Sequence, residues 1–307
     1  MLSPYKGKAR TELRVIPNCK QIKMDKIQKV KTDNLEFDCR VSGEKENELI
    51  IFLHGFPETS FMWQKLMHKM AGLGYFCVAP DMRGYSENAS PRGKENYNIK
   101  ALSEDVLSFA HAMGKQKFHL VGHDWGAVIG WYTVYKNPES IMSWTALSVP
   151  HNRAFGKAIK LNKEQHKKSR YIKWFLVPFW PEFILRKNDF AKFRRLWRNS
   201  SAEELENYLS VFRRKNTLTA ALNYYRANIG RIKKERIGDI KTPTLFIWGE
   251  NDLAIGAFAA EGNHKYMKGD YTFLQVKGGH WLIQTNYDEV EKAVILHISK
   301  YKSDQNQ

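Results

Sequence analysis

The feature that most constrains the fold is the run LVGHDWGA, residues 120–127, near the middle of the chain. It follows the apolar stretch Phe118–Val121 and opens a helix-like stretch that reaches Tyr135. Glycines two positions before and after a polar residue, where a strand turns into a helix, are typical of a sharp bend that lifts the central side chain above a sheet. The residue at the centre of this bend is Asp124.

A carboxylate at such a bend has its own chemistry. Its reference pKa of about 3.9 means that it is ionised at neutral pH and needs no general base before it attacks. A carboxylate nucleophile is suited to displacement at a saturated carbon, which leaves an ester on the enzyme. We therefore predict that Asp124 is a nucleophile rather than a solvated turn or cap residue.

The hydrophobic pattern around the bend predicts the class of fold. Strand-like runs at residues 26–31, 35–41 and 49–53 are separated by turn signals, which suggests antiparallel strands at a sheet edge. Helices and strands then alternate, with helices expected at 60–73, 99–113, 127–135 and 287–299, and strands at 75–79, 118–121, 141–149, 244–248 and 272–276. Alternating units of this kind predict an α/β fold with a mostly parallel central sheet and helices on both faces.

The alternation stops at Pro150. Residues 151–236 hold helix-like pieces and no convincing strand, so we predict an inserted helical lid over 151–236 and an α/β core made of 1–150 and 237–307, with a basic N-terminal arm at 1–25. The aromatic residues Trp174, Phe179 and Trp180 are expected to pack inside the lid. Trp174 is also a candidate for contact with substrate.

The charge of the chain is concentrated in this lid. The net charge is +17, and residues 151–236 contain 22 Lys and Arg against seven Asp and Glu, which accounts for +15. No nucleic-acid-binding motif accompanies that charge, and the aromatics lie among prolines rather than on an RNA-binding strand. We favour a basic surface that is simply solvated. Attraction of anionic substrates ranks second, and a nucleic-acid or anionic-membrane site ranks third.

Cysteine usage and hydropathy bear on location. Cys19, Cys39 and Cys77 have no zinc-ligand spacing and are odd in number, so we expect free buried thiols in a reducing compartment. No apolar signal segment is visible, and the apolar stretches are too short to cross a bilayer. We predict a cytoplasmic protein without metal, cofactor, nucleic-acid partner or stable membrane anchor, and leave a homodimer open.

Four further motifs stand at or just after predicted strand ends: HGFPE (54–58), DMRGYS (81–86), WGEND (248–252) and GGHW (278–281). Catalytic side chains of open α/β sheets gather at the carboxyl ends of strands. The loop at 54–58 can aim the backbone N–H of Phe56 at the same point as that of Trp125, which predicts an oxyanion hole, and Pro57 is a candidate for a cis peptide. His54 and His123 are expected to be structural.

The five motifs, in this order, resemble the α/β-hydrolase superfamily and specifically its Asp-nucleophile branch. That branch contains soluble epoxide hydrolases, haloalkane dehalogenases and haloacetate dehalogenases. The resemblance runs from about Leu49 to the C-terminus. It implies the α/β-hydrolase fold and a catalytic triad of Asp124, Asp252 and His280, acting as nucleophile, orienting acid and base.

The predicted lid distinguishes epoxide hydrolases from the two families of dehalogenases. The segments SRYIKWFLVP (169–178) and ALNYYR (221–226) resemble the two lid motifs with which epoxide hydrolases each supply a tyrosine. The resemblance assigns Tyr171 and Tyr225, rather than Tyr224. Phenols with a reference pKa of about 10 can donate to an epoxide oxygen, whereas a departing halide needs no proton. The Asn of many haloalkane dehalogenases is replaced by Phe56, and the His-Trp pair of haloacetate dehalogenases by Tyr171-Ile172.

We therefore predict an epoxide hydrolase that forms vicinal diols through an ester on Asp124, hydrolysed by water that His280 and Asp252 activate. Phe56, Trp125 and Trp174 are the expected substrate contacts. Leu176 stands where epoxide hydrolases usually have Gln, which can shift substrate preference, and Ser86 replaces a usual Gly with a structural effect. The alternatives are a dehalogenase, a catalytically silent ligand receptor and, more distantly, a nucleic-acid-binding module.

Overall fold

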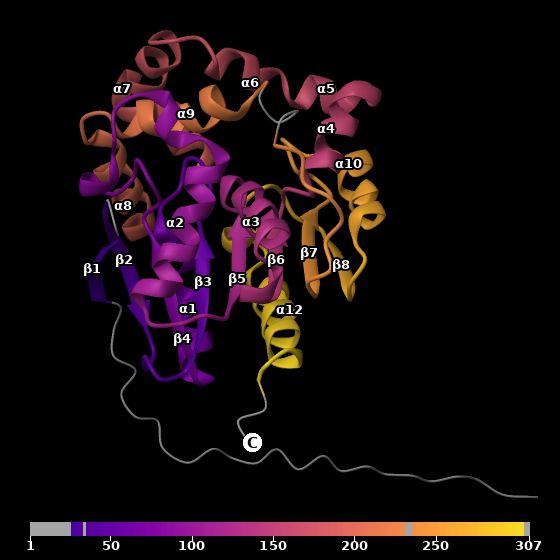
Figure 1. The fold of residues 1–307 in the computed structure, drawn as a ribbon. Helices are drawn as coiled ribbons and strands as arrows, with labels where there is room; N and C mark the ends of the chain where they lie inside the picture. Colours follow the sequence, from indigo (N-terminus) through magenta and orange to yellow (C-terminus); the bar gives the residue numbers. More distant parts are fainter. Residues whose placement is uncertain (1–25, 33–34, 231–234, 304–307) are drawn as a thin grey trace, which may run out of the picture.

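An eight-stranded sheet forms the centre of the protein (Figure 1). The computed structural model describes residues 26–32, 35–230 and 235–303, so the arm at 1–25, which includes Cys19, lies outside the described residues. The strand order is β1-β2-β4-β3-β5-β6-β7-β8. The strands are β1 Lys26–Lys31, β2 Glu36–Ser42, β3 Glu48–Leu53, β4 Tyr75–Pro80, β5 Phe118–His123, β6 Ile141–Leu147, β7 Thr244–Gly249 and β8 Tyr271–Val276.

The strand directions confirm a mostly parallel sheet. Only the pairs β1·β2 and β2·β4 are antiparallel, and every other pair is parallel. The expectation that residues 49–53 form a third antiparallel edge strand was wrong, because β3 lies inside the sheet between β4 and β5. The reason is its unbroken apolar run: Leu49–Leu53 is fully buried, as a strand covered on both faces must be.

The strand order changes direction at β3, which is the topological switch point of the sheet. From β3 the chain passes through α1 (Gln64–Gly72) to β4 on one side, and then through α2 (Ile99–Ala112) to β5 on the other side of β3. Because parallel crossovers are right-handed, α1 covers one face and α2 the other, together with α3 (Trp125–Lys136). The loops after β3 and β5 therefore diverge and leave a crevice between them.

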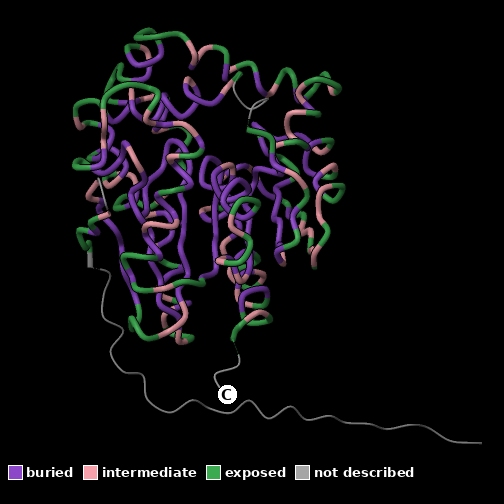
Figure 2. Tube along the Cα trace, viewed as in Figure 1, coloured by how far each residue is buried: buried purple, intermediate pink, exposed green. Residues whose placement is uncertain are grey.

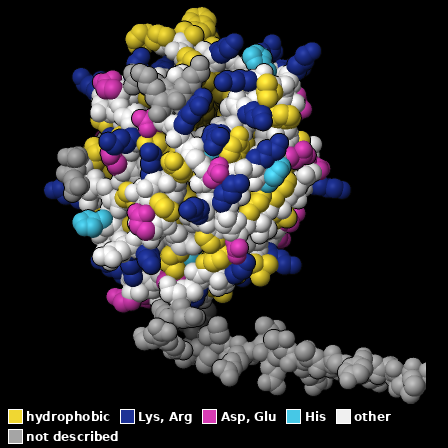
Figure 3. Space-filling model, turned by 45° about the vertical axis from the view of Figure 1, so that its right-hand side comes forward, with side chains coloured by type: hydrophobic (Ala, Val, Ile, Leu, Met, Phe, Trp, Pro, Cys, Tyr) yellow, Lys and Arg dark blue, Asp and Glu magenta, His cyan; other side chains and the backbone are white. Residues whose placement is uncertain are grey.

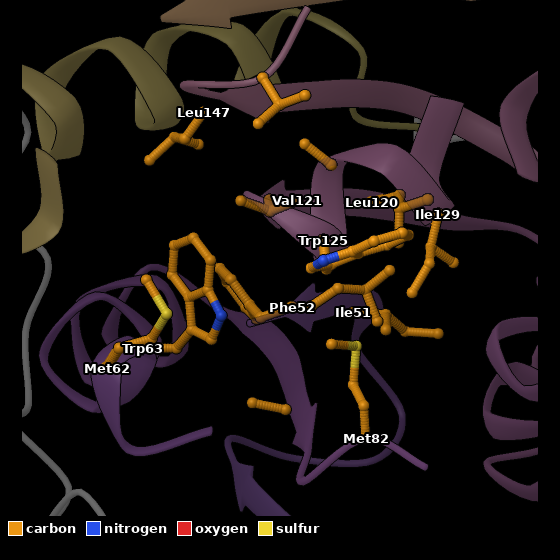
Figure 4. Close-up of a cluster of buried hydrophobic side chains, with 14 of the residues drawn as sticks. Ile51, Phe52, Met62, Trp63, Met82, Leu120, Val121, Trp125, Ile129 and Leu147 are labelled. Atoms are coloured by element: carbon orange, nitrogen blue, oxygen red, sulfur yellow. The ribbon is translucent and has the colours of Figure 1, made fainter. Parts of the chain in front are cut away.

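Buried side chains on both faces of the sheet hold these layers together (Figure 2). Figure 4 shows part of this core, in which Phe52 of β3 lies beside Trp63 and the ring of Trp125 lies near Leu120 and Ile129. The centroids of the Phe52 and Trp63 rings are 5.5 Å apart. The remaining core helices are α10 Ala257–Glu261, α11 Leu282–Thr285 and α12 Tyr287–Lys300.

In the described residues, six helices follow β6 and precede β7. They are α4 Asn152–Leu161, α5 Lys163–Lys168, α6 Arg170–Phe175, α7 Trp180–Leu196, α8 Ala202–Arg213 and α9 Thr217–Asn228. In Figure 1, α4 to α7 and α9 lie above the sheet, and α8 lies lower, at the left edge near β1 and β2. The described part of this stretch, residues 151–230, contains no strand. Helix α7 is bent, because the backbone at residues 188–190 is left-handed. The lid boundaries at 151 and 236 stay a prediction.

The lid is fastened through α9. The guanidinium of Arg226 donates to the carbonyls of Phe175 and Val177 and to the carboxylate of Glu182, which ties α9 to α6 and to the first turn of α7. The placement of Phe179 and Trp180 in the lid core was wrong: they are 83% and 57% exposed. Phe175 and Leu185 already fill the inner side of this turn, so both rings face outward.

Candidate active site

Asp124 occupies the bend between β5 and α3 with φ 50° and ψ −115°. A residue other than glycine at positive φ is strained by about 1–3 kcal/mol and needs surrounding structure to hold it. The flanking glycines allow that structure to come close. A Cβ atom on Gly126 would lie 2.2 Å from the carbonyl oxygen of Leu53, and one on Gly122 would lie 2.6 Å from the carbonyl oxygen of Gly126. The glycine spacing of the sequence is thus a packing requirement of this bend.

The carboxylate of Asp124 is held from two sides. Its Oδ1 accepts a hydrogen bond of 2.8 Å from the backbone N–H of Phe56, in the loop after β3. Its Oδ2 lies 3.4 Å from Nε2 of His280, in the loop after β8. The peptide bond between Phe56 and Pro57 is cis. The two oxygens of the carboxylate therefore have different surroundings, one facing a backbone donor and the other an imidazole.

His280 is oriented by Asp252. Nδ1 of His280 lies 2.7 Å from Oδ2 of Asp252, and the other oxygen of Asp252 accepts the N–H groups of Ala254 and Ile255 at 2.7 and 2.9 Å. Asp252 is fully buried in the loop after β7. Because a carboxylate only accepts, Nδ1 carries the proton and Nε2 is directed toward Asp124.

Neighbouring groups shift the pKa of Asp124 and that of His280. Burial acts to raise the pKa of Asp124, but the hydrogen bond and charge of His280 outweigh it and the pKa is lowered. Burial acts to lower the pKa of His280, but the carboxylates of Asp252 and Asp124 outweigh it and the pKa is raised well above the usual value. Both shifts favour an ionised Asp124 beside a protonated His280.

A buried pair behind His280 fixes its backbone, and sequence reasoning missed it. The His280 carbonyl lies 2.9 Å from Nε2 of His123 and accepts a hydrogen bond of 2.7 Å from Ser148. Nδ1 of His123 lies 3.0 Å from the carboxylate of Glu58, and both side chains are fully buried. The signal was present in Glu58 of HGFPE and His123 of the bend, but only the fold brings them together.

His54 connects two loops of the core. Its Nδ1 lies 3.0 Å from the carbonyl of Gly55, and its Nε2 accepts the N–H of Met82 at 3.0 Å. Burial lowers the pKa of His54, which keeps the ring neutral, as one donor and one acceptor require. The ring therefore joins the loop after β3 to the loop after β4. Neither His54 nor His123 lines the cavity described next.

A largely apolar cavity of about 420 Å³ lies between the lid and the triad. Asp124 and His280 line it from the core, and Tyr171 of α6 and Tyr225 of α9 line it from the lid. The two tyrosine rings are nearly perpendicular, with centroids 6.4 Å apart. Burial raises the pKa of both phenols, and the nearby carboxylate of Asp124 raises each further. Both therefore stay protonated and can donate.

Tyr224 and Tyr225 face different surroundings. Tyr224 does not line the cavity; its hydroxyl donates to the carbonyl of Arg83 at 2.7 Å. The ring of Tyr225 packs edge-to-face against Phe56 and Phe175, with centroids 5.8 and 5.0 Å apart. Adjacent helix positions differ by about 100° around the axis, so only one of the two can point inward.

Of the three residues expected to contact substrate, two have side chains that line the cavity. Phe56 and Trp174 line the cavity, but Trp125 does not: its ring packs against Tyr224 and Tyr225, with centroids 5.5 and 5.0 Å away. The side chain of Trp125 does not line this cavity because α3 turns the ring into the core, and a contact of Trp125 with substrate stays a prediction. Sequence reasoning also missed the part of the wall that α7 supplies, namely Leu185, Lys192, Phe193, Arg195 and Leu196.

The residues that the structure describes carry neither a metal-binding cluster nor a membrane-spanning helix. Those residues hold no group of three His, Cys, Asp or Glu side chains arranged to bind a metal ion. None of the helices that the structure describes is long and apolar enough to span a membrane. Cys39 and Cys77 are buried in β2 and β4.

The fold, the order of the strand-end loops and the cavity under a helical lid define a class. A family model described as alpha/beta hydrolase fold matches residues 48–287, and the chain belongs to that family. The α/β-hydrolase fold that the motifs implied is thereby confirmed. The protein is a hydrolase of this family and, within it, resembles the epoxide hydrolases.

Individual relatives carry this resemblance. Epoxide hydrolase 4 of Homo sapiens is 33% identical over 279 residues, which cover 87% of this chain and 76% of the relative. Epoxide hydrolase 3 of Xenopus tropicalis is 29% identical and covers 87% of this chain and 75% of its own length. The crystal structure of a Bacillus megaterium epoxide hydrolase with an inhibitor matches at a TM-score of 0.80 and 26% identity, covering 89% of this chain and all of that one.

Proposed function

We propose that this protein hydrolyses epoxides to vicinal diols through a covalent ester on Asp124. The single observation that carries the proposal is the composition of the cavity: an ionised carboxylate lines it from the core while two protonated phenols line it from the lid. A nucleophile and an acid on opposite sides of one apolar space suit a reaction that breaks a carbon–oxygen bond and releases an alkoxide.

The two oxygens of Asp124 suggest the roles in the first step. Oδ1 is engaged by the N–H of Phe56, which leaves Oδ2 to attack an epoxide carbon. The carbon–oxygen bond of the ring breaks, and the released oxygen takes a proton from Tyr171 or Tyr225. The product of this step is a hydroxyalkyl ester in which Oδ1 is the carbonyl oxygen.

The second step follows from the change in charge. Esterification removes the negative charge of Asp124, which is one of the causes of the raised pKa of His280. The pKa of His280 then falls, its proton passes through solvent to the tyrosinate left by the first step, and the neutral imidazole can take a proton from water. That water attacks the carbonyl carbon of Asp124, and the N–H groups of Phe56 and Trp125 stabilise the oxyanion. The N–H of Phe56 already donates to Oδ1 before the reaction. When the ester C–O bond breaks, the diol oxygen takes the proton of the new carboxyl group, so that the diol leaves and Asp124 is again ionised beside a protonated His280.

The experiment that tests this scheme traps the ester. His280→Gln keeps the nucleophile but lacks the base, so incubation with styrene oxide should add one substrate mass to the intact protein. Asp124→Ala should give neither the adduct nor diol while remaining folded. An unmodified His280→Gln protein across a panel of aromatic and aliphatic epoxides would contradict the covalent scheme.

The dehalogenase alternative is decided by the same panel. Haloalkanes and haloacetate, scored for released halide, should not be turned over at the rates of epoxides. Halide release without diol formation from any epoxide would replace the proposal. The cytoplasmic location, the homodimer and the lack of a nucleic-acid partner stay predictions.

A further inference from the structure

The outer surface of the lid carries a group of apolar side chains that neither pack in the core nor line the cavity. Val177, Phe179, Trp180 and Phe183 are 45%, 83%, 57% and 56% exposed, and we call these four residues the lid patch. They lie on the turn between α6 and α7 and the first turn of α7. The centroids of the Trp180 and Phe183 rings are 6.0 Å apart, and Phe179 directly precedes Trp180 in the chain. Isolated exposed apolar residues are ordinary, but a contiguous cluster marks a binding surface.

The surroundings of the lid patch are strongly basic. Figure 3 shows hydrophobic side chains gathered at the upper edge of the molecule with Lys and Arg beside them. Between residues 151 and 200 the exposed acidic side chains are Glu164 and Asp189, and each has basic partners: Lys168 for Glu164, and Arg194 and Arg213 for Asp189. On α6 and on α7 before its bend, the two helices that flank the lid patch, the exposed basic side chains are Arg170, Lys173, Arg186 and Lys187, and Nζ of Lys187 lies 4.7 Å from the centroid of the Phe183 ring.

We propose that the lid patch docks reversibly on an anionic lipid bilayer. Apolar rings that enter the interface, ringed by Lys and Arg that meet anionic headgroups, are the combination that surface-bound segments use. Charge decides against other occupants: a second copy would bring the same positive surface, and the arm at 1–25 is itself basic. Nucleic acid would match the charge but would leave Val177 and Phe183 without an apolar environment.

The position of the cavity suggests a function for docking, namely access of apolar molecules to the cavity. The segment from α6 to α7 faces inward with Trp174, Phe175 and Leu185, which line the cavity, and outward with the lid patch. Exposed Lys192, Arg195 and Leu196 of the same helix also line the cavity. A docked lid would bring the cavity wall close to apolar molecules dissolved in the bilayer. The docking is independent of the proposed epoxide hydrolysis. The delivery of apolar molecules from the bilayer to the cavity rests on that proposed function.

Vesicle binding of the full chain tests the docking. The protein should sediment with vesicles of phosphatidylglycerol and phosphatidylcholine at about 0.1 M salt, bind poorly to phosphatidylcholine alone, and dissociate as salt screens the charges. Phe179→Ser combined with Phe183→Ser should lose at least tenfold in binding. Arg186→Gln combined with Lys187→Gln should lose about fivefold for each charge removed. The matched controls are Leu296→Ser on α12 and Lys45→Gln in the turn between β2 and β3, exposed residues away from the lid, which should bind as the parent does.

A second readout locates the contact. All nine tryptophans lie in the described residues, and Trp180 alone among them is exposed. Brominated lipids should therefore quench tryptophan fluorescence in the parent protein and not in Trp180→Phe, while Trp180→Phe still sediments. Turnover of a water-soluble epoxide without vesicles should be unchanged in all these variants, so a failure of the reaction and a failure of docking are separable. Unchanged vesicle binding after loss of the two phenylalanines, or binding to duplex DNA but not to vesicles, overturns the proposal.

Discussion

At the scale of single residues, the pKa of Asp124 and that of His280 depend on each other. The carboxylates of Asp252 and Asp124 raise the pKa of His280, and His280 lowers that of Asp124. In the proposed scheme, the imidazole becomes a base once esterification removes the charge of Asp124. The backbone of His280, anchored by His123 and Ser148, keeps Nε2 in place through that change.

Two adjacent tyrosines provide a matched test at this scale. Tyr225→Phe removes a phenol that lines the cavity and should lower kcat for epoxides by about 10²–10⁴-fold. Tyr224→Phe removes a hydrogen bond to Arg83 instead and should leave kcat nearly unchanged at a stability cost of about 1 kcal/mol. Steady-state kinetics and urea unfolding of both variants measure the two effects. Equal losses of kcat would mean that Tyr225 has no special role.

At the scale of the element, α3 is built to lie close to the sheet. Gly130 on this helix faces the fully buried ring of Trp144, and an added Cβ would lie 2.0 Å from that ring. The same closeness brings the first turn of α3 against the end of β3, where Gly126 meets Leu53. The bend at Asp124 thus depends on the packing of a whole helix.

A pair of glycine substitutions separates packing from helix propensity. Gly130→Ala should destabilise the protein by about 1–3 kcal/mol, because the buried indole of Trp144 cannot move away. Gly156→Ala on α4, where no atom lies within 4 Å of the added Cβ, should instead stabilise it by about 0.5–1 kcal/mol. Chemical unfolding of both variants is the measurement, and destabilisation of both would contradict the packing argument.

At the scale of the whole molecule, a carboxylate far from the site joins distant parts of the chain. The carboxylate of Glu48, at the start of β3, lies 3.5 Å from Nε2 of His119 on β5 and accepts the N–H of Ser303 near the C-terminus at 2.7 Å. Burial acts to raise the pKa of Glu48, but His119 and Ser303 outweigh it and lower the pKa to about 2. The ionised form is therefore favoured by folding.

This shift predicts part of the acid sensitivity of the protein. Because the folded pKa is below the unfolded one, the stability that Glu48 contributes is present above about pH 4.5 and is lost as the pH falls toward 2. Glu48→Gln should lower Tm at pH 7 by an amount equivalent to roughly 1–3 kcal/mol and flatten the decline of Tm between pH 5 and 2. The exposed Glu44→Gln is the control, and identical pH profiles of Glu48→Gln and the parent would contradict the assignment.

Taken over the whole chain, the sequence by itself determined the class of fold, the bend at Asp124 and the order of the loops that carry Asp252 and His280. These features are local, since a glycine spacing or a buried strand is written in neighbouring residues. Only the tertiary structure decided that β3 is interior, that Trp125 turns into the core, that Glu58 and His123 support His280, and that Phe179 and Trp180 face outward. Each of these depends on which surface of another segment is already filled, and that is a property of long-range packing rather than of local pattern.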